Sequence, residues 1–192
     1  MSSSKPLSFM KAIDSIYLAG FDVFRQDSIE HGERLKALAS EHGLVGLYPL
    51  DNKIPGINGD GVLVGDTLVP ITKHEIAKKI AFANIELIKR CDALVANANS
   101  FRGHEPDSGT MFEIGYAIAL GKPVYLYLSD LRPMIDKVPN VNGVDEQGYT
   151  VEDFNFPVNL MMAGTADAIL GSYAEALDLI VTRNRLLAEM TL

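Results

Sequence analysis

The feature that most constrains the fold is an alternation of short apolar runs with longer segments of helical periodicity. Ser15–Gly20 and Asp92–Ala96 are short apolar runs, as expected of strands that are covered on both faces. Between them, Asp27–His42 and Thr72–Cys91 carry apolar residues at helical spacing. Because helices that alternate with buried strands form crossover connections, this pattern predicts an α/β fold with a parallel sheet.

The remaining predicted elements extend the same alternation to the end of the chain. We expect further strands at 44–48, 123–128 and 168–170, and further helices at 110–120 and 172–188. The result is a doubly wound, flavodoxin/Rossmann-like sheet of about five mainly parallel strands with helices on both faces. Residues 51–70 and 129–163 are expected to be irregular, because they are rich in turn-forming residues.

Length and composition limit the classes of protein to consider. The 192 residues are expected to form a single domain, 1–192, with residues 1–13 as a flexible N-terminus. A formal charge of −8 disfavours a nucleic-acid or anionic-membrane partner, because both attract positive proteins. One cysteine fits a reducing compartment, and no apolar run approaches the ~20 residues of a membrane span. We therefore expect a cytoplasmic protein.

Topology predicts where a ligand would bind. Right-handed crossovers bring the carboxyl ends of parallel strands to one edge of the sheet, where ligands of such folds bind. The loops at that edge are 20–27, 49–71, 97–109 and 129–163. They contain no G-x-G-x-x-G, no Walker-type loop, no G-x-S-x-G and no zinc-ligand spacing, so we expect neither a metal nor an organic cofactor.

The segment EPDSGTMFEIGYA, residues 105–117, concentrates carboxylates and small residues at this edge. Glu113 has two interpretations. With Thr110 it forms a capping box in the first turn of a helix, or it directs a carboxylate at a ligand. Asp107 suits an N-cap or an Asx turn as well as a site, and Gly109 would allow close approach of a substrate.

Three other side chains on the same edge are candidates for ligand contact. Tyr17 lies within the first strand, where it is either core or a buried phenol that needs a partner. Phe24 is a large ring on a loop and could stack on a planar ligand. Asn159 either caps local backbone or points into a site, its own or that of a neighbouring subunit.

Four segments of the sequence, taken in order, are IYLAGFDVF, YPLDN, CDALVANANSFRGHEPDSGTMFEIGYAIALGKPV and FPVNLM. Together they resemble the nucleoside 2-deoxyribosyltransferase family. The resemblance implies that Glu113 is the nucleophile, that Asp107 holds the sugar hydroxyls and that Tyr17 orients the nucleophile. It also implies that Asn159 is donated by an adjacent subunit to the 5′-hydroxyl of the substrate, and hence a homo-oligomer.

The base side of the expected site departs from the family pattern. The resemblance places Asp51 and Asn52 near the base without assigning their contacts. Asn84 stands where many members have an aspartate that handles base protons, and an amide cannot relay a proton in that way. Lys53 replaces a base-reading glutamine of some members, and Phe21 replaces a common proline.

The activity that the resemblance implies is transfer of a 2-deoxyribosyl group between nucleobases, in nucleoside salvage and with a leaning to purines. Its substrates would be a 2′-deoxynucleoside and a free base, and it would pass through a covalent glycosyl-Glu intermediate. Two alternatives stay open. One is a 2′-deoxynucleoside 5′-monophosphate N-glycosidase, which Asp107 disfavours because its charge would repel a phosphate. The other is a non-catalytic nucleotide-binding module.

Overall fold

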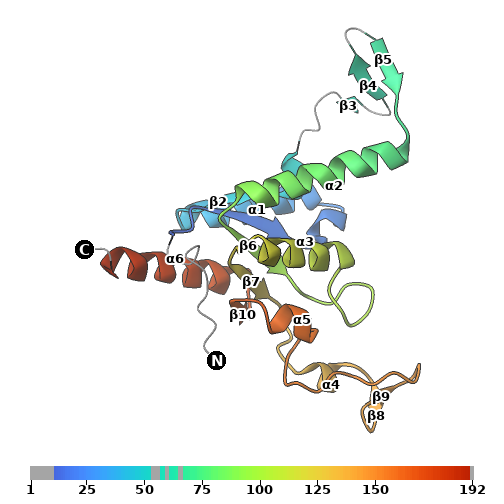
Figure 1. The fold of residues 1–192 in the computed structure, drawn as a ribbon, viewed down its shortest axis with the longest axis vertical. Coiled ribbons are helices and arrows are strands. Elements are labelled where there is room, and N and C mark those ends of the chain that lie inside the picture. The colour runs from blue at the N-terminus through green and yellow to red at the C-terminus, as the bar shows by residue number, and fades with distance from the viewer. Residues whose placement is uncertain (1–10, 53–56, 59–60, 65–66, 191–192) are drawn as a thin grey trace.

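A five-stranded parallel sheet forms the centre of the molecule (Figure 1). The computed structural model describes residues 11–52, 57–58, 61–64 and 67–190. The strands of this sheet are β1 (Ser15–Ala19), β2 (Val45–Leu47), β6 (Ala93–Asn97), β7 (Val124–Tyr127) and β10 (Ala168–Leu170). Their order is β2-β1-β6-β7-β10, and every neighbouring pair is parallel. The predicted doubly wound α/β fold is confirmed, and the topological switch point lies between β1 and β6.

Helices cover both faces of this sheet. They are α1 (Ser28–Glu41), α2 (Lys73–Arg90), α3 (Ser108–Ala119), α4 (Met134–Lys137), α5 (Leu160–Ala163) and α6 (Tyr173–Met190), with 3₁₀ turns η2 (Phe21–Phe24) and η3 (Pro49–Asp51). Along β1, Tyr17 and Ala19 face an apolar cluster with α2, α3 and α5, whereas Ile16 and Leu18 face a second cluster with α1 and α6. This alternation follows from the two-residue period of a strand.

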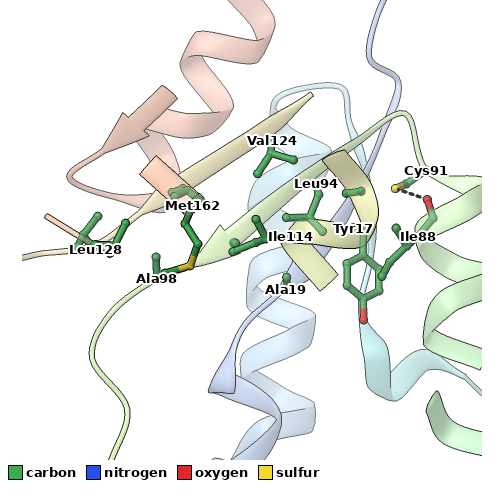
Figure 2. Packing of buried hydrophobic residues seen from close by; sticks show 14 of the residues in the cluster. Tyr17, Ala19, Ile88, Cys91, Leu94, Ala98, Ile114, Val124, Leu128 and Met162 are labelled. Atoms are coloured by element: carbon green, nitrogen blue, oxygen red, sulfur yellow. Dashed lines mark hydrogen bonds between the residues drawn. The ribbon is translucent and has the colours of Figure 1, made fainter. Parts of the chain in front are cut away.

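The cluster under α2 and α3 positions the candidate site. Ile88 from α2, Ile114 from α3 and Leu94 from β6 meet there and are almost completely buried (Figure 2). The Cys91 thiol at the end of α2 donates a hydrogen bond to the Ile88 carbonyl oxygen, 3.1 Å away. Since both helices are fixed against the sheet by this packing, the side chains on their facing surfaces keep a defined geometry.

The two segments expected to be irregular contain strands. Residues 51–70 include β3 (Ile57–Asn58), β4 (Gly61–Val64) and β5 (Thr67–Pro70), an antiparallel sheet at the far end of α2 from the central sheet (Figure 1). Residues 129–163 include α4, α5 and a hairpin of β8 (Asn140–Val141) and β9 (Val144–Asp145). The expectation was wrong because the apolar stretches in these segments are short and stand between turn residues, which obscures a strand pattern.

The expected flexible N-terminus stays a prediction, and residues 1–10 lie outside the described residues. Among the described residues, Ile13 is buried, and the Asn184 side chain accepts from its N–H at 2.9 Å and donates to its carbonyl at 2.7 Å. The chain is therefore bonded to α6 just before β1.

Candidate active site

Helix α3 begins earlier than the sequence predicts, and as a result the Glu113 carboxylate has no role in capping it. The helix begins at Ser108 with Asp107 as its N-cap, and Asp107 Oδ2 accepts hydrogen bonds from Thr110 N at 3.0 Å and Thr110 Oγ1 at 3.2 Å. The capping box of Thr110 with Glu113, one of the two interpretations from sequence, is therefore absent, because Asp107 takes the cap three residues before Thr110. Glu113 falls in the second turn, where it caps nothing.

Glu113 is held by Tyr17 instead. The Tyr17 hydroxyl donates to Glu113 Oε1 at 2.6 Å, a short bond of the charge-assisted kind. Tyr17 is fully buried in β1, and Figure 2 shows its hydroxyl directed away from the apolar cluster that holds its ring. The strand thus supplies a rigid donor at one end of the carboxylate.

Burial and charge set the protonation of this pair. Burial raises the pKa of Glu113 from an ordinary 4.5 to about 7, the Tyr17 hydrogen bond opposes the rise, and the charge of Asp107 adds to it. Burial, followed by the charge of Glu113, raises the pKa of Tyr17 far above its ordinary value. The phenol therefore stays protonated as a donor, while Glu113 titrates near neutral pH.

Two adjoining cavities open on Glu113. The first, about 230 Å³, contains Phe24, Asn84, Asp107, Gly109 and Glu113 in its wall. The second, about 370 Å³, is an apolar groove between α2 and α3 that shares Asn84, Gly109 and Glu113 with the first. The structure thus brings five of the predicted site residues to one place, and Tyr17 joins them through its bond to Glu113.

The turn after β1 brings Phe24 to this place. Gly20 has a φ of 155°, and a Cβ there would lie 2.8 Å from Asn97 Cβ, so only glycine fits. The Asn97 side chain then donates to Asp22 Oδ2 at 2.8 Å, and His31 Nε2 lies 3.3 Å from Asp22 Oδ1. This buried network joins the loop after β1 to the end of β6, across the switch point.

The residues expected near the base are divided between two places. Asn52 donates through Nδ2 to Asn84 Oδ1 at 3.1 Å, which connects it to the cavity wall. Asp51 is engaged elsewhere, since its carboxylate accepts from Tyr48 N at 3.0 Å and pairs with Lys36 Nζ at 2.6 Å. The structure does not bring Asp51 into the Glu113 cavity, and its contacts are those of a local cap and a surface ion pair.

Asn159 also lies outside the cavity of its own chain. It is the N-cap of α5, with Oδ1 accepting from Met161 N at 2.9 Å. Its Nδ2 donates to Glu152 Oε1 at 2.6 Å. The local capping role, one of the two interpretations from sequence, is therefore present, and Asn159 is not in the wall of either cavity at Glu113.

Sequence reasoning missed an aromatic stack beside the cavity. The Phe101 ring stacks on Phe21, with centroids 4.9 Å apart, and on Phe24, with centroids 5.4 Å apart. The Arg102 guanidinium lies over the Phe101 ring at 4.6 Å. A phenylalanine in the otherwise polar loop 97–109, at the ligand edge, was the signal that could have identified this stack.

A family model for nucleoside 2-deoxyribosyltransferase matches residues 16–161 of the chain. The chain belongs to the nucleoside 2-deoxyribosyltransferase family. Members of this family are enzymes that act on small nucleoside substrates, and the matched stretch contains Tyr17, Asp107, Glu113 and Asn159.

Similar proteins agree with this family and with the fold. A solved 2-desoxiribosyltransferase from Leishmania mexicana is 34% identical, covers 88% of this chain and 97% of its own, and has a TM-score of 0.70. A solved 2-deoxyribosyltransferase from Bacillus psychrosaccharolyticus shares the fold at 18% identity and a TM-score of 0.54, covering 85% and 90% of the two chains. An uncharacterised protein of Schizosaccharomyces pombe is 32% identical over 143 residues, which span 72% of this chain and 63% of that relative's length.

Two findings concern metals and membranes. Within the part of the chain that the structure describes, no group of three or more histidine, cysteine, aspartate or glutamate side chains is arranged to bind a metal ion. None of the helices among the described residues combines the length and the apolar character that crossing a bilayer requires.

Proposed function

We propose that this protein transfers a 2-deoxyribosyl group between the nucleobases of 2′-deoxynucleosides, through a covalent ester on Glu113. The observation that carries the proposal is the 2.6 Å hydrogen bond from Tyr17 to Glu113 Oε1, in a cavity wall that also contains Asp107. A carboxylate held by one oxygen, beside a second carboxylate, suits a reaction in which an anomeric carbon becomes positively charged.

The two chemical steps follow from the carboxylate oxygens. Glu113 Oε1 accepts the hydrogen bond from Tyr17, whereas Glu113 Oε2 accepts none from the described residues. In the first step, the C1′–N bond breaks, its electron pair leaves with the base, and Oε2 bonds to C1′. In the second, a nitrogen lone pair of the incoming base attacks C1′ and the C1′–Oε2 bond breaks, so that configuration at C1′ is retained after two displacements.

Asp107 is suited to hold the sugar because its two oxygens have separate tasks. Oδ2 accepts both hydrogen bonds from Thr110, and among the described residues none engages Oδ1. Oδ1 is thus left to accept from a sugar hydroxyl. Gly109, which follows in the same wall, allows the sugar to approach the backbone closely.

Phe24 and the paired amides of Asn52 and Asn84 form the base side of the proposed site. Phe24 lines the cavity and is 58% exposed although its ring stacks on Phe101, so exposed ring surface remains for contact with a planar base. The Asn84 amide supplies a hydrogen-bond donor and acceptor but no transferable proton. Proton delivery to the leaving base therefore needs a route other than residue 84. On the family resemblance, we expect purines as the preferred bases.

A second copy of the chain completes the proposed site. Asn159 does not line the cavity of its own chain, and we propose that it reaches the 5′-hydroxyl of a nucleoside bound to a neighbouring protomer. A neighbour placed over the cavity would also exclude water, which competes with the incoming base. The protein would then act as a homo-oligomer, in nucleoside salvage in the cytoplasm.

A base-exchange assay tests this function. With deoxyinosine as donor and adenine as acceptor, we expect deoxyadenosine and hypoxanthine from the wild type and near-complete loss of both in Glu113→Ala. Glu30→Ala, which removes an exposed carboxylate from α1, is the matched control. Normal exchange by Glu113→Ala would eliminate Glu113 as the nucleophile.

The same assay separates the alternative hydrolase. Deoxyinosine and its 5′-monophosphate are each incubated with and without free adenine. Transfer predicts product from the nucleoside that depends on the acceptor base, because the Asp107 charge opposes a phosphate. Release of hypoxanthine from the monophosphate alone would instead assign the protein as a nucleotide hydrolase.

A further inference from the structure

The segment that carries Asn159 is fixed to the body of the molecule more firmly than its loop position requires. Val158 is 1% exposed and Met162 is 5% exposed, and both belong to the apolar cluster under α3. Before them, the Phe156 carbonyl accepts from Met134 N at 2.8 Å, and the Pro157 carbonyl accepts from Lys137 Nζ. The backbone on both sides of Asn159 is therefore anchored.

Glu152 extends this anchoring to the side chain of Asn159. Its Oε1 accepts from Asn159 Nδ2 at 2.6 Å, and its Oε2 accepts from Leu160 N at 2.8 Å. One carboxylate thus accepts hydrogen bonds both from the side chain of the N-cap, Asn159, and from the first backbone N–H of α5. Hydrogen bonds from two donors to an ionised acceptor are among the stronger ones in proteins.

These bonds fix which way the Asn159 amide faces. Oδ1 lies against the N–H of Met161, at 2.9 Å, and Nδ2 lies against the carboxylate of Glu152. A flipped amide would set oxygen against a carboxylate and donor against donor, so only one orientation satisfies the network. The amide retains one N–H and one oxygen lone pair for another partner, in directions that the network defines.

The carboxylate of Glu152 interacts unfavourably with a second carboxylate, that of Glu105. The charge of Glu152 raises the pKa of Glu105, after burial, which is the larger cause. Glu105 Oε2 is itself buried and has no hydrogen-bond partner among the described residues. Lys137 offsets part of this repulsion at Glu105. Glu152 thus adds negative charge to an already acidic place, and the N–H groups of Asn159 and Leu160 are its compensation.

We propose that Glu152 is a positioning residue for the transfer reaction, which orients Asn159 so that its remaining N–H meets the 5′-oxygen of a nucleoside in the neighbouring protomer. The inference rests on the proposed function of Asn159 and goes beyond it by assigning the group that sets its direction. A carboxylate that holds a substrate-binding amide affects binding without touching the substrate.

Steady-state kinetics and binding test the proposal together. We expect Glu152→Ala to raise KM for the deoxynucleoside about tenfold with a smaller change in kcat, because the amide is lost as an oriented donor. Asn159→Ala should give a similar KM, and the double variant should be no worse than Asn159→Ala alone, because one residue acts through the other. Asp153→Ala, which removes the neighbouring exposed carboxylate, is the matched control and should keep the wild-type KM.

A binding arm makes the test independent of turnover. Calorimetry with deoxyinosine compares Glu113→Ala with Glu113→Ala/Glu152→Ala, and we expect about tenfold weaker binding in the latter. Glu152→Gln, whose amide oxygen can still accept from Asn159, should recover much of the loss. A merely structural role would lower the melting temperature without this recovery.

The outcomes separate the inference from the function on which it rests. Unchanged KM and Kd in Glu152→Ala, with both raised in Asn159→Ala, would overturn the role of Glu152 alone. Losses that multiply in the double variant would overturn it too, since the two residues would then act independently. A third outcome is that the wild type exchanges no bases but the variants show the expected differences in Kd for the nucleoside. That result would overturn the transferase function and leave the positioning role of Glu152 supported.

Discussion

At the scale of single residues, the proposed chemistry depends on how Glu113 is bonded and protonated. Burial raises its pKa to about 7, and the Tyr17 hydroxyl stabilises the ionised form through one oxygen. Only the ionised carboxylate is a nucleophile, so the same environment that desolvates Glu113 also limits the fraction that is reactive near neutral pH.

The raised pKa predicts opposite effects of pH on activity and on stability. We expect kcat/KM to rise with pH through a midpoint near 7, as Glu113 ionises. The folded state binds the proton of Glu113 more tightly than the unfolded state, so this group lowers stability as pH rises from about 4.5 to 7. Glu113→Gln keeps an acceptor for Tyr17 and does not titrate.

Urea denaturation at two pH values measures this effect. Glu113→Gln should be about 3 kcal/mol more stable than the wild type at pH 8 and nearly equal to it at pH 4.5. A stability difference that does not change with pH would show that Glu113 ionises normally in the folded protein.

Tyr17→Phe tests the other half of the pair. Loss of the hydroxyl removes the bond that favours the ionised carboxylate, so the pKa of Glu113 should rise further. We expect kcat/KM to fall at least about tenfold near pH 7 and the midpoint of its pH profile to move to higher pH. Tyr149→Phe, at an exposed position, is the control, and an unmoved midpoint in Tyr17→Phe would contradict the account.

At the scale of elements, α3 combines a helix cap with a proposed sugar contact in one aspartate. Asp107→Asn retains an oxygen acceptor for Thr110, whereas Asp107→Ala removes it. We expect Asp107→Ala to lose about 1 kcal/mol of stability and Asp107→Asn much less, while both raise KM for the deoxynucleoside. Thermal unfolding and kinetics separate the two roles, and an Asp107→Asn enzyme with wild-type KM would limit Asp107 to capping.

The sequence predicted the helices and strands whose hydrophobic periodicity is clear. It failed where neighbouring residues compete for the same local role, such as the cap of a helix. The buried strands around Tyr17 and Leu94 were predictable, because their short, uninterrupted apolar runs alternate with segments of helical periodicity. The start of α3 was not, since Asp107 and Thr110 are both good caps and only the folded packing selects one. The hairpin turn at Asn142–Gly143, where both residues have positive φ, is typical of such turns but stands between strands of two residues.

The candidate site also contains residues whose place the sequence predicts and residues whose place it does not. Glu113, Asp107 and Phe24 are near one another because loops after adjacent strands share one sheet edge, which topology predicts. Asp51 lies outside the Glu113 cavity because its carboxylate is engaged by Lys36 and Tyr48 N, and single contacts of this kind leave no periodic signal in a sequence. Glu152 could not be found from sequence, since its role depends on a bond to a residue seven positions away on an irregular segment.

At the scale of the whole molecule, two projections extend from its body (Figure 1), and exposed apolar side chains lie on one of them and beside Asn159. The β3–β5 sheet stands at the end of α2, and the β8–β9 hairpin lies beside α4 on the other side of the body (Figure 1). Val141 is 77% exposed on the hairpin, and Met161 is 67% exposed next to Asn159. Contact with a second protomer, as the proposed site requires, would remove such side chains from water.

Subunit mixing tests whether Asn159 acts between chains. Glu113→Ala and Asn159→Ala are each expected to be impaired, but a mixed oligomer would contain sites with an intact Glu113 and an intact donated Asn159. We expect exchange activity to rise when the two variants are unfolded together and refolded as a mixture. Activity equal to the average of the separate variants would show that Asn159 does not serve a neighbouring site.

The central claim is that Glu113 becomes bonded to the anomeric carbon of the sugar. Intact-mass spectrometry of protein quenched during turnover with a deoxynucleoside tests it most directly, followed by peptide mapping of any adduct. We predict a deoxyribosyl adduct on the peptide that contains Glu113, and none in Glu113→Gln. Continued base exchange with no adduct at any quench time, or an adduct on a different side chain, would contradict the account.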